Sequence, residues 1–258
     1  MGTWRWLSLG SLALILSACA QHLPLAVESV PDGLRHLGEV AGSAAATTDI
    51  VLLCDRHETH GAITRSSSAW MALRKANARA VRFLLTKGFS LLGAEAALGP
   101  LPDDTIAYAH RQAWTEARDQ GEDIDAINIY QPLRFQWDHA PQLEVWGIED
   151  PAQYALDTDA LERINALRLA EFANQAEVDA AKLAITALTD QIRSRADARG
   201  TAAASNLHER MQQSGAERAM LLLGSAHCVA ALRELQRLGH GVLFFRAHAM
   251  NQVVPRGR

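Results

Sequence analysis

The chain of 258 residues is poor in cysteine, with only Cys19, Cys54 and Cys228. Small secreted domains held together by disulfides need several cysteine pairs, so that class is excluded. Basic residues are not in excess either, because 25 Lys and Arg stand against 29 Asp and Glu, a formal charge of −4. Without a basic patch interleaved with aromatic residues, we expect no nucleic-acid partner. The chain also lacks a repeat of fixed period, which excludes a solenoid.

An apolar run near the N-terminus, Trp6 to Ala18, follows the single positive charge of Arg5. It is shorter than the roughly 20 residues that a membrane span needs, and it has the length of a secretory signal core. An uncleaved N-terminal anchor is the alternative interpretation.

The run ends in Leu16-Ser17-Ala18-Cys19, which resembles the bacterial lipobox. The resemblance implies a signal peptide over residues 1–18, lipidation of Cys19 and a membrane partner held through the lipid. Because Ala20 rather than Asp follows the cysteine, we expect an outer-membrane lipoprotein whose domain faces the periplasm.

The remaining chain, about 240 residues, is long enough for one large α/β domain. We expect a tether over residues 19–47, rich in Ala, Gly and Ser, and then a single α/β domain over residues 48–258. Short runs of large apolar residues bounded by turns predict strands that are covered on both faces. Helical periodicity lies between these runs, so the order of elements predicts a mainly parallel sheet with helices on both faces.

The predicted strands are Ile50–Cys54, Phe89–Ala97, Leu143–Asp150, Met220–Leu223 and Gly241–Phe245. Among the helices, we expect one over residues 64–87 and another over residues 124–137. An Ala-, Leu-, Glu- and Arg-rich stretch over residues 156–213 predicts a helical-hairpin insertion, with Gly200 at its turn.

Every predicted strand is followed by a histidine or an acid. In chain order these residues are Asp55, His57 and His60; Glu95; Glu149 and Asp150; His227; and His248 with Asn251. Because ligands collect where the strands of an open α/β sheet end, we expect these side chains to meet at one edge.

His57 and His227 are the leading candidates, since imidazole titrates and binds metals near neutral pH. The alternative for each is a histidine that caps a helix or binds a loop carbonyl. His60 joins the site if the turn continues as a helix, and is an exposed residue otherwise.

Glu95 lies in an otherwise apolar stretch, and a buried carboxylate needs a metal, a histidine or an arginine nearby. Its alternative role is a strand-end acid paired with a structural arginine. One of Glu149 and Asp150 alternatively caps the helix that begins at Pro151. His248 and Asn251 have surface positions as their alternative.

Cys54 and Cys228 lie beside the two histidine turns. They either form one bridge or remain separate packed thiols, because the sequence does not show the short Cα–Cα distance that a disulfide needs.

Several short motifs resemble one superfamily, which contains the ChaN haem-binding lipoproteins, the Tiki/TraB metal-dependent proteases and the erythromycin-esterase-like enzymes. The motifs are the first histidine turn, the strand ending at Glu95, Tyr130-Gln131-Pro132-Leu133, and the Leu-Leu-Leu-Gly-x-x-His turn at residues 221–227. The resemblance spans roughly residues 48–250. It implies that His57 is the first motif histidine, that Gly224 and His227 form the second motif, and that Glu95 is the intermediate acid.

Two positions depart from the superfamily pattern. Cys54 stands where glycine is usual and Asp55 where glutamate is usual. Glycine permits close backbone approach that cysteine does not, and aspartate is one methylene shorter.

Three functions follow from these residues. The first is a lipid-anchored hydrolase of amides or esters in small molecules or peptides. In it, His57, Glu95 and His227 hold a divalent metal, and Asp55 or Glu149 is the general base; without a metal the same groups support acid–base chemistry. The second is a haem- or iron-binding lipoprotein with histidine or Tyr130 as axial ligand. The third is an inactive scaffold, which the departures at residues 54 and 55 favour.

Overall fold

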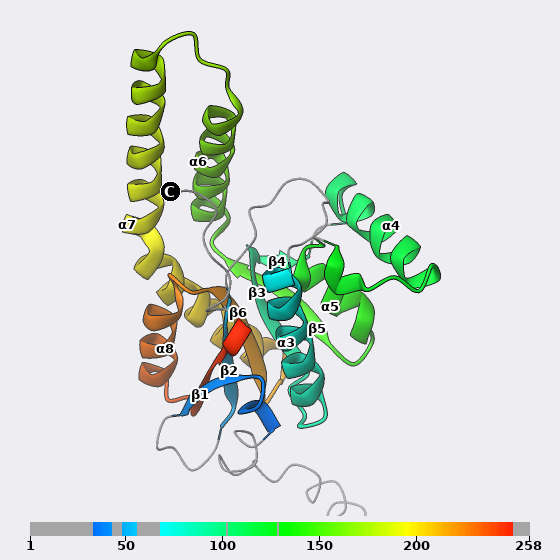
Figure 1. The fold of residues 1–258 in the computed structure, drawn as a ribbon. Helices are drawn as coiled ribbons and strands as arrows, with labels where there is room; N and C mark the ends of the chain where they lie inside the picture. Colours follow the sequence, from blue (N-terminus) through cyan, green and yellow to red (C-terminus); the bar gives the residue numbers. More distant parts are fainter. Residues whose placement is uncertain (1–32, 43–47, 56–67, 102, 128, 250–258) are drawn as a thin grey trace, which may run out of the picture.

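The computed structural model describes residues 33–42, 48–55, 68–101, 103–127 and 129–249. Seven strands form one sheet (Figure 1): β1 (Gly38–Gly42), β2 (Ile50–Asp55), β3 (Leu91–Ala97), β4 (Gly99–Pro100), β5 (Glu144–Glu149), β6 (Ala219–Gly224) and β7 (Val242–Ala247). Within the described ranges, six α-helices accompany them: α3 (Ser68–Leu85), α4 (Thr105–Asp119), α5 (Gln131–His139), α6 (Pro151–Leu169), α7 (Gln175–Ser214) and α8 (Cys228–Arg237).

The strand order in the sheet is β1-β7-β2-β6-β3-β5-β4. The five inner strands run parallel, and only the edge strands β1 and β4 are antiparallel to their neighbours. The α/β class and the mainly parallel sheet predicted from the sequence are therefore confirmed. Because all five inner strands share one direction, their carboxyl ends lie at one edge of the sheet.

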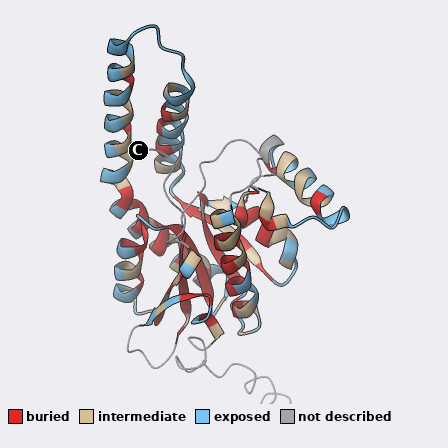
Figure 2. Cartoon of the chain, in the orientation of Figure 1, coloured by how far each residue is buried: buried red, intermediate tan, exposed pale blue. Residues whose placement is uncertain are grey.

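Helices cover both faces of the sheet, as predicted. Every residue of β2 and β6 is buried, and alternate side chains point to opposite faces. Leu53 and Leu222 pack on one face with residues of α3 and α5. Leu52 and Leu221 pack on the other face with residues of α7 and α8. Figure 2 shows the resulting distribution, with buried residues in the sheet and on the helix surfaces next to it.

The helical hairpin exists, but its predicted turn is wrong. The helices α6 and α7 are joined at residues 170–174, and α7 runs without interruption through Gly200. A Cβ atom at Gly200 would lie 2.3 Å from the backbone oxygen of His227. The glycine therefore permits α7 to approach α8 closely, which is a packing reason for glycine inside a helix. The outer part of the hairpin projects away from the sheet (Figure 1).

The helix predicted over residues 124–137 is divided in two. A 3₁₀ turn, η2 (Ile124–Ala126), is followed by α5, which begins at Gln131 with a proline in its first turn. Proline has no N–H, and its ring collides with the carbonyl four residues earlier in a continuous helix. Pro132 therefore fits the start of a helix and not its interior.

Part of the predicted tether belongs to the sheet. Strand β1 lies inside residues 19–47 and pairs with β7, with Val40 opposite Phe245. The prediction is wrong for this strand because its sequence, Gly-Glu-Val-Ala-Gly, has one large apolar residue and glycine at both ends. The signal peptide and Cys19 lie outside the described residues. None of the helices described by the structure is long and apolar enough to cross a membrane.

Candidate functional site

Glu95 lies where the pairing of β3 with β5 is irregular. The register between these strands shifts between Ala94 and Ala97, and such bulges redirect side chains. Oε2 of Glu95 accepts a hydrogen bond from the backbone N–H of Gly224, at 2.7 Å. This bond links the ends of β3 and β6, so the two predicted motifs meet at the carboxyl edge of the sheet.

An arginine on α7 gathers the carboxylates at this edge. Arg199 donates to Glu95 Oε1 at 3.0 Å and to Glu149 Oε1 at 2.9 Å, and it also pairs with Asp157 on α6. Arg195, one turn earlier on α7, donates to Asp157 at 2.8 Å. We call these five residues the Arg199 cluster. The cluster joins the ends of β3 and β5 to the base of the hairpin.

Three side chains of the cluster are buried. The side chain of Arg199 is 7% exposed, that of Glu149 is 2% exposed and that of Asp157 is 3% exposed. In such surroundings an unpaired charge costs several kcal/mol, on the order of 3–5 when one partner of a buried pair is removed. The three carboxylates and the guanidinium groups therefore depend on one another.

His227 faces this cluster. It occupies the N-cap position of α8, but its side chain makes no capping bond. Nδ1 contacts the carbonyl oxygen of Ala196 at 2.9 Å, and Nε2 lies 3.4 Å from Oε1 of Glu95. Because a carbonyl only accepts, Nδ1 carries a proton and the neutral ring presents a lone pair to the carboxylate. A proton or a cation is needed between Nε2 and Oε1.

The charge of Glu95 has a clear effect on His227. Burial by itself lowers the pKa of His227, but the hydrogen bond and the negative charge of Glu95 outweigh burial and raise that pKa above its usual value. The protonated imidazolium is thereby favoured beside the carboxylate.

Glu149 has one oxygen bound to Arg199, and its other oxygen, Oε2, is buried with no partner in the described part of the chain. The pKa of Glu149 is raised to about 7, first by burial and then by the charge of Glu95, while Arg199 opposes both effects. A carboxyl group with a pKa near 7 exchanges a proton readily at neutral pH.

A charge count explains why Glu149 and His227 behave together. The cluster contains three carboxylates and two guanidinium groups, so it carries one negative charge when His227 is neutral. One added proton balances this charge, and the groups that take it up near neutral pH are Glu149 and His227. Such a proton belongs to the pair and not to either residue.

Asp55 lies at the same edge. It is 4% exposed, its Cα pairs with that of Gly224, and its backbone carbonyl accepts the N–H of Ser225 at 2.8 Å. The edge therefore brings together four of the predicted residues: Asp55, Glu95, Glu149 and His227.

Other predicted residues lie elsewhere. His57, His60 and Asn251 are outside the described residues. His248 is exposed, and its Nε2 contacts the carbonyl of Arg35 at 3.3 Å. The alternative interpretation of His248, a surface position, therefore applies.

Asp150 is a helix cap. Its Oδ1 accepts from the backbone N–H groups of Ala152 and Gln153, at 2.9 and 3.0 Å, as expected for an aspartate at an N-cap. The capping alternative therefore applies to Asp150, while Glu149 belongs to the Arg199 cluster.

The two cysteines form the bridge that the sequence left open. Cys54 and Cys228 are disulfide-bonded, with their Cα atoms 6.1 Å apart. The bridge ties the end of β2 to the start of α8, and its chain neighbours are Asp55 and His227. Cys54, which stands where glycine is usual in the superfamily that the sequence resembles, therefore forms half of this bridge.

Tyr130, the predicted haem ligand, contacts the backbone of Glu95. Its hydroxyl donates to the backbone carbonyl of Glu95 at 2.7 Å, and burial raises its pKa well above the usual value. A tyrosine that ligates ferric haem does so as phenolate, so this environment opposes ligation.

The predicted metal ligands are brought together only in part. Glu95 and His227 face each other, and the third, His57, lies outside the described residues. Within the part of the chain that the structure describes, no three His, Cys, Asp or Glu side chains are grouped to hold a metal. The His227 ring nevertheless has the arrangement typical of a ligand, because its other nitrogen is held by a carbonyl.

Sequence reasoning missed Arg195 and Arg199, and with them Asp157. The buried Glu95 required a cation or histidine nearby, but nothing in the pattern of a charged helix distinguished a buried arginine from an exposed one. The usable signal was Gly200, since a glycine inside a helical pattern marks close packing.

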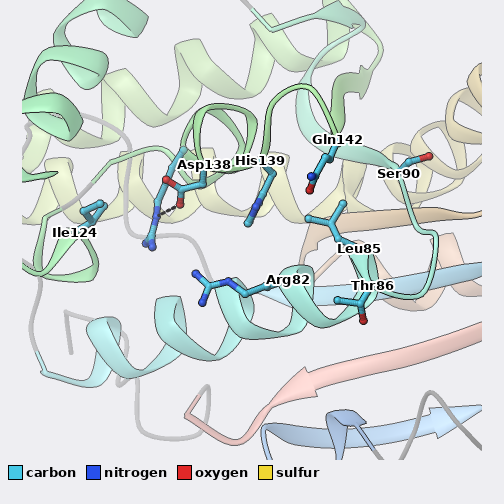
Figure 3. Close-up of a pocket in the computed structure, with 9 residues that line it drawn as sticks. Arg82, Leu85, Thr86, Ser90, Ile124, Asp138, His139 and Gln142 are labelled. Atoms are coloured by element: carbon cyan, nitrogen blue, oxygen red, sulfur yellow. Dashed lines mark hydrogen bonds and ion pairs between the residues drawn. The ribbon is translucent and has the colours of Figure 1, made fainter.

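A pocket of about 630 Å³ lies away from this edge. Ser90, before β3, and Gln142, before β5, place it at the amino-terminal edge of the sheet. Figure 3 shows Arg82 and His139 on its walls. None of the predicted site residues lines it, so it is separate from the Arg199 cluster.

Comparison with protein-family models, with curated proteins and with solved structures finds no match to this chain. The resemblance to the ChaN and Tiki superfamily stays a prediction, and the function is argued from the geometry of the site.

Proposed function

We propose that the protein is a lipid-anchored hydrolase of amide or ester bonds whose active centre is formed by His227 and the Arg199 cluster. Its substrates are small molecules or peptides. The lipid is attached at Cys19, and the domain faces the periplasm from the outer membrane.

The observation that carries the proposal is the facing pair of His227 Nε2 and Glu95 Oε1, 3.4 Å apart. Two acceptor atoms at this distance require a proton or a cation between them. Buried ionisable groups with shifted pKa values are concentrated at catalytic sites. This pair lies at the carboxyl ends of parallel strands, where α/β proteins place their ligands.

Glu149 is the general base in this proposal. Its Oε2 is buried and has no partner among the described residues, and its pKa is raised to about 7 by burial and by the charge of Glu95. A base with this pKa removes a proton from an attacking water at neutral pH and releases it later. Arg199 holds Oε1 of the same carboxylate and so fixes the direction of Oε2. Asp55, buried at the end of β2, is the second candidate for this role.

His227 and Glu95 fit two positions of a divalent-metal site, and His57 is the predicted third ligand. A bound divalent metal would supply a water whose pKa is near 7. The chain itself supplies the rest: Ala196 orients the His227 ring through Nδ1, and the N–H of Gly224 holds Glu95. Without a metal, the protonated His227 remains a general acid beside Glu149.

The proposal is tested with p-nitrophenyl esters and peptide p-nitroanilides, assayed with and without added Zn²⁺. We expect the wild type to hydrolyse at least one class. Glu149→Gln and His227→Gln should each lower kcat/KM about 100-fold or more, in the range of general acid–base contributions. His248→Gln changes an exposed histidine and is the matched control.

Metal content provides the second readout. The wild type should bind a stoichiometric divalent metal that is lost in the His57→Ala, His227→Ala double variant. An inactive wild type, or full activity in His227→Gln, contradicts the hydrolase; activity without stoichiometric metal contradicts only the metal.

A further inference from the structure

A second histidine group lies at the opposite edge of the sheet. Asp49 precedes β2, His240 precedes β7, and His208 lies on α7. Since His208 follows Arg199 by nine residues on the same helix, the two are about 13 Å apart along its axis. The group is therefore separate from the proposed active centre.

The two imidazoles meet nitrogen to nitrogen. Nδ1 of His208 is 2.9 Å from Nε2 of His240, and the rings cross at 71°. On the far side of each ring is a polar partner. Asp49 Oδ2 is 2.6 Å from His240 Nδ1, and Gln212 Nε2 is 2.9 Å from His208 Nε2.

The hydrogen-bond partners of the two rings indicate which ring nitrogens carry a proton. A carboxylate only accepts, so Nδ1 of His240 carries a proton and its Nε2 presents a lone pair. One proton therefore lies between the rings, on Nδ1 of His208. A metal ion that replaces this single proton would take both imidazole nitrogens as ligands once the rings turn from the N–H···N line toward it.

The surroundings resemble those of metal-binding histidines. Such histidines usually give their second N–H to a carboxylate, a carbonyl or water, which fixes the ring and raises its basicity. Asp49 already accepts the second N–H of His240. Rotation of the Gln212 amide would offer its oxygen to Nε2 of His208 in the same way. The group lies near the surface, with the His240 side chain 11% exposed and that of Asp49 33% exposed.

The chemistry of the two ligands indicates which metal they would hold. The 2.9 Å between the nitrogens is the distance of an ordinary hydrogen bond, so the ligand type indicates the metal. Imidazole nitrogen suits Cu²⁺, Ni²⁺ and Zn²⁺. Cu²⁺ also binds nitrogen ligands most strongly among the first-row divalent ions.

We propose that His208 and His240 form a copper(II) site, held in place by Asp49, at the amino-terminal edge of the sheet. Water fills the remaining coordination positions, because no third His, Cys, Asp or Glu ligand accompanies the pair among the described residues.

The test is titration of the full chain with CuCl₂, followed by calorimetry and electron paramagnetic resonance. The His57→Ala, His227→Ala double variant, which lacks the proposed hydrolase metal site, should bind one Cu²⁺ with a tetragonal spectrum and hyperfine splitting from two imidazole nitrogens. His208→Gln and His240→Gln should each weaken binding about 100-fold or more. Asp49→Asn should weaken it about 10–100-fold, the usual effect of removing an orienting partner. His139→Gln, a histidine of the separate pocket, should change nothing.

Nuclear magnetic resonance of the wild type decides the matter even if a variant fails to fold. Substoichiometric Cu²⁺ should broaden the ring signals of His208 and His240 before that of His227. Broadening at His227 alone, absence of Cu²⁺ binding, or an unchanged spectrum in both folded histidine variants would overturn the proposal.

Discussion

Substitution of Gly200 by alanine tests how closely the hairpin must pack to keep the site intact. Its new Cβ would lie 2.3 Å from the carbonyl oxygen of His227 and 3.1 Å from the Cβ of Ala230. The first contact is with backbone, which cannot rotate aside, so α7 and α8 must separate. Arg199 precedes the substituted residue, and His227 carries the carbonyl that is displaced.

The magnitude follows from two opposing effects. Alanine in place of glycine inside a helix is favourable by about 1 kcal/mol. Overpacking costs about 1–3 kcal/mol, and a contact with backbone belongs at the upper end. We therefore expect Gly200→Ala to lower the free energy of unfolding by about 1–2 kcal/mol, which is a fall in Tm of about 2–8 °C for a domain of this size.

Urea denaturation and the ring signals of His227 provide the assay. The matched control is Ala198→Gly, an exposed position two residues earlier on α7. It should lose about 1 kcal/mol through helix propensity and leave the His227 signals unchanged. Gly200→Ala should move them, because the contact of Nδ1 with Ala196 is disturbed. A Gly200→Ala protein that is more stable than the wild type, with unaltered His227 signals, would refute the packing argument.

Three further predictions concern charge and the disulfide. Arg199→Met should lower the free energy of unfolding at pH 7 by about 3–5 kcal/mol in urea melts, because it leaves buried carboxylates unpaired. The control Arg193→Met changes a side chain that is 75% exposed and should cost less than about 1 kcal/mol. Equal losses in the two variants would contradict the mutual dependence of the charges in the Arg199 cluster. Glu149 has a pKa of about 7 in the folded protein against 4.5 in the unfolded chain, so folding takes up a proton and stability should fall as pH rises from about 4.5 through 7. Glu149→Gln should reduce this dependence of stability on pH. An unchanged dependence would count against the raised pKa of Glu149. The raised pKa of His227 acts in the same direction, since its stabilisation is present below pH 6.5 and is lost as pH rises through the folded pKa. Replacing Cys54 and Cys228 by alanine opens a cross-link of sequence separation 174 and should lower the free energy of unfolding by about 2–5 kcal/mol; no loss would show that the bridge does not stabilise the fold.

The inner strands were predictable because each is a short run of large apolar residues between turns. That pattern arises when a strand is buried on both faces, as in a parallel sheet. It therefore predicts the parallel arrangement of the strands as well as their burial. The parallel order then predicts that Asp55, Glu95, Glu149 and His227 lie at one edge of the sheet.

The edge strands and the arginines were not predictable in the same way. Strand β1 has one large apolar residue and is held by pairing with β7, a contact between residues some 200 positions apart in the chain. Arg199 lies in a helix rich in exposed charges, and its burial depends on where the hairpin meets the sheet. Gly200 was assigned to a turn from its local preference, whereas tertiary packing determines its place.

The pH titration of His227 tests the central claim most directly, namely that one proton is shared at the edge between the imidazole and the carboxylates. Nitrogen–proton correlation spectra would follow the His227 ring in the wild type and in Glu149→Gln. We expect a pKa above the usual 6.5 in the wild type and a lower pKa in the variant, because a neighbouring negative charge is removed. A pKa at or below 6.5 in the wild type, or one that Glu149→Gln leaves unchanged, would contradict the account.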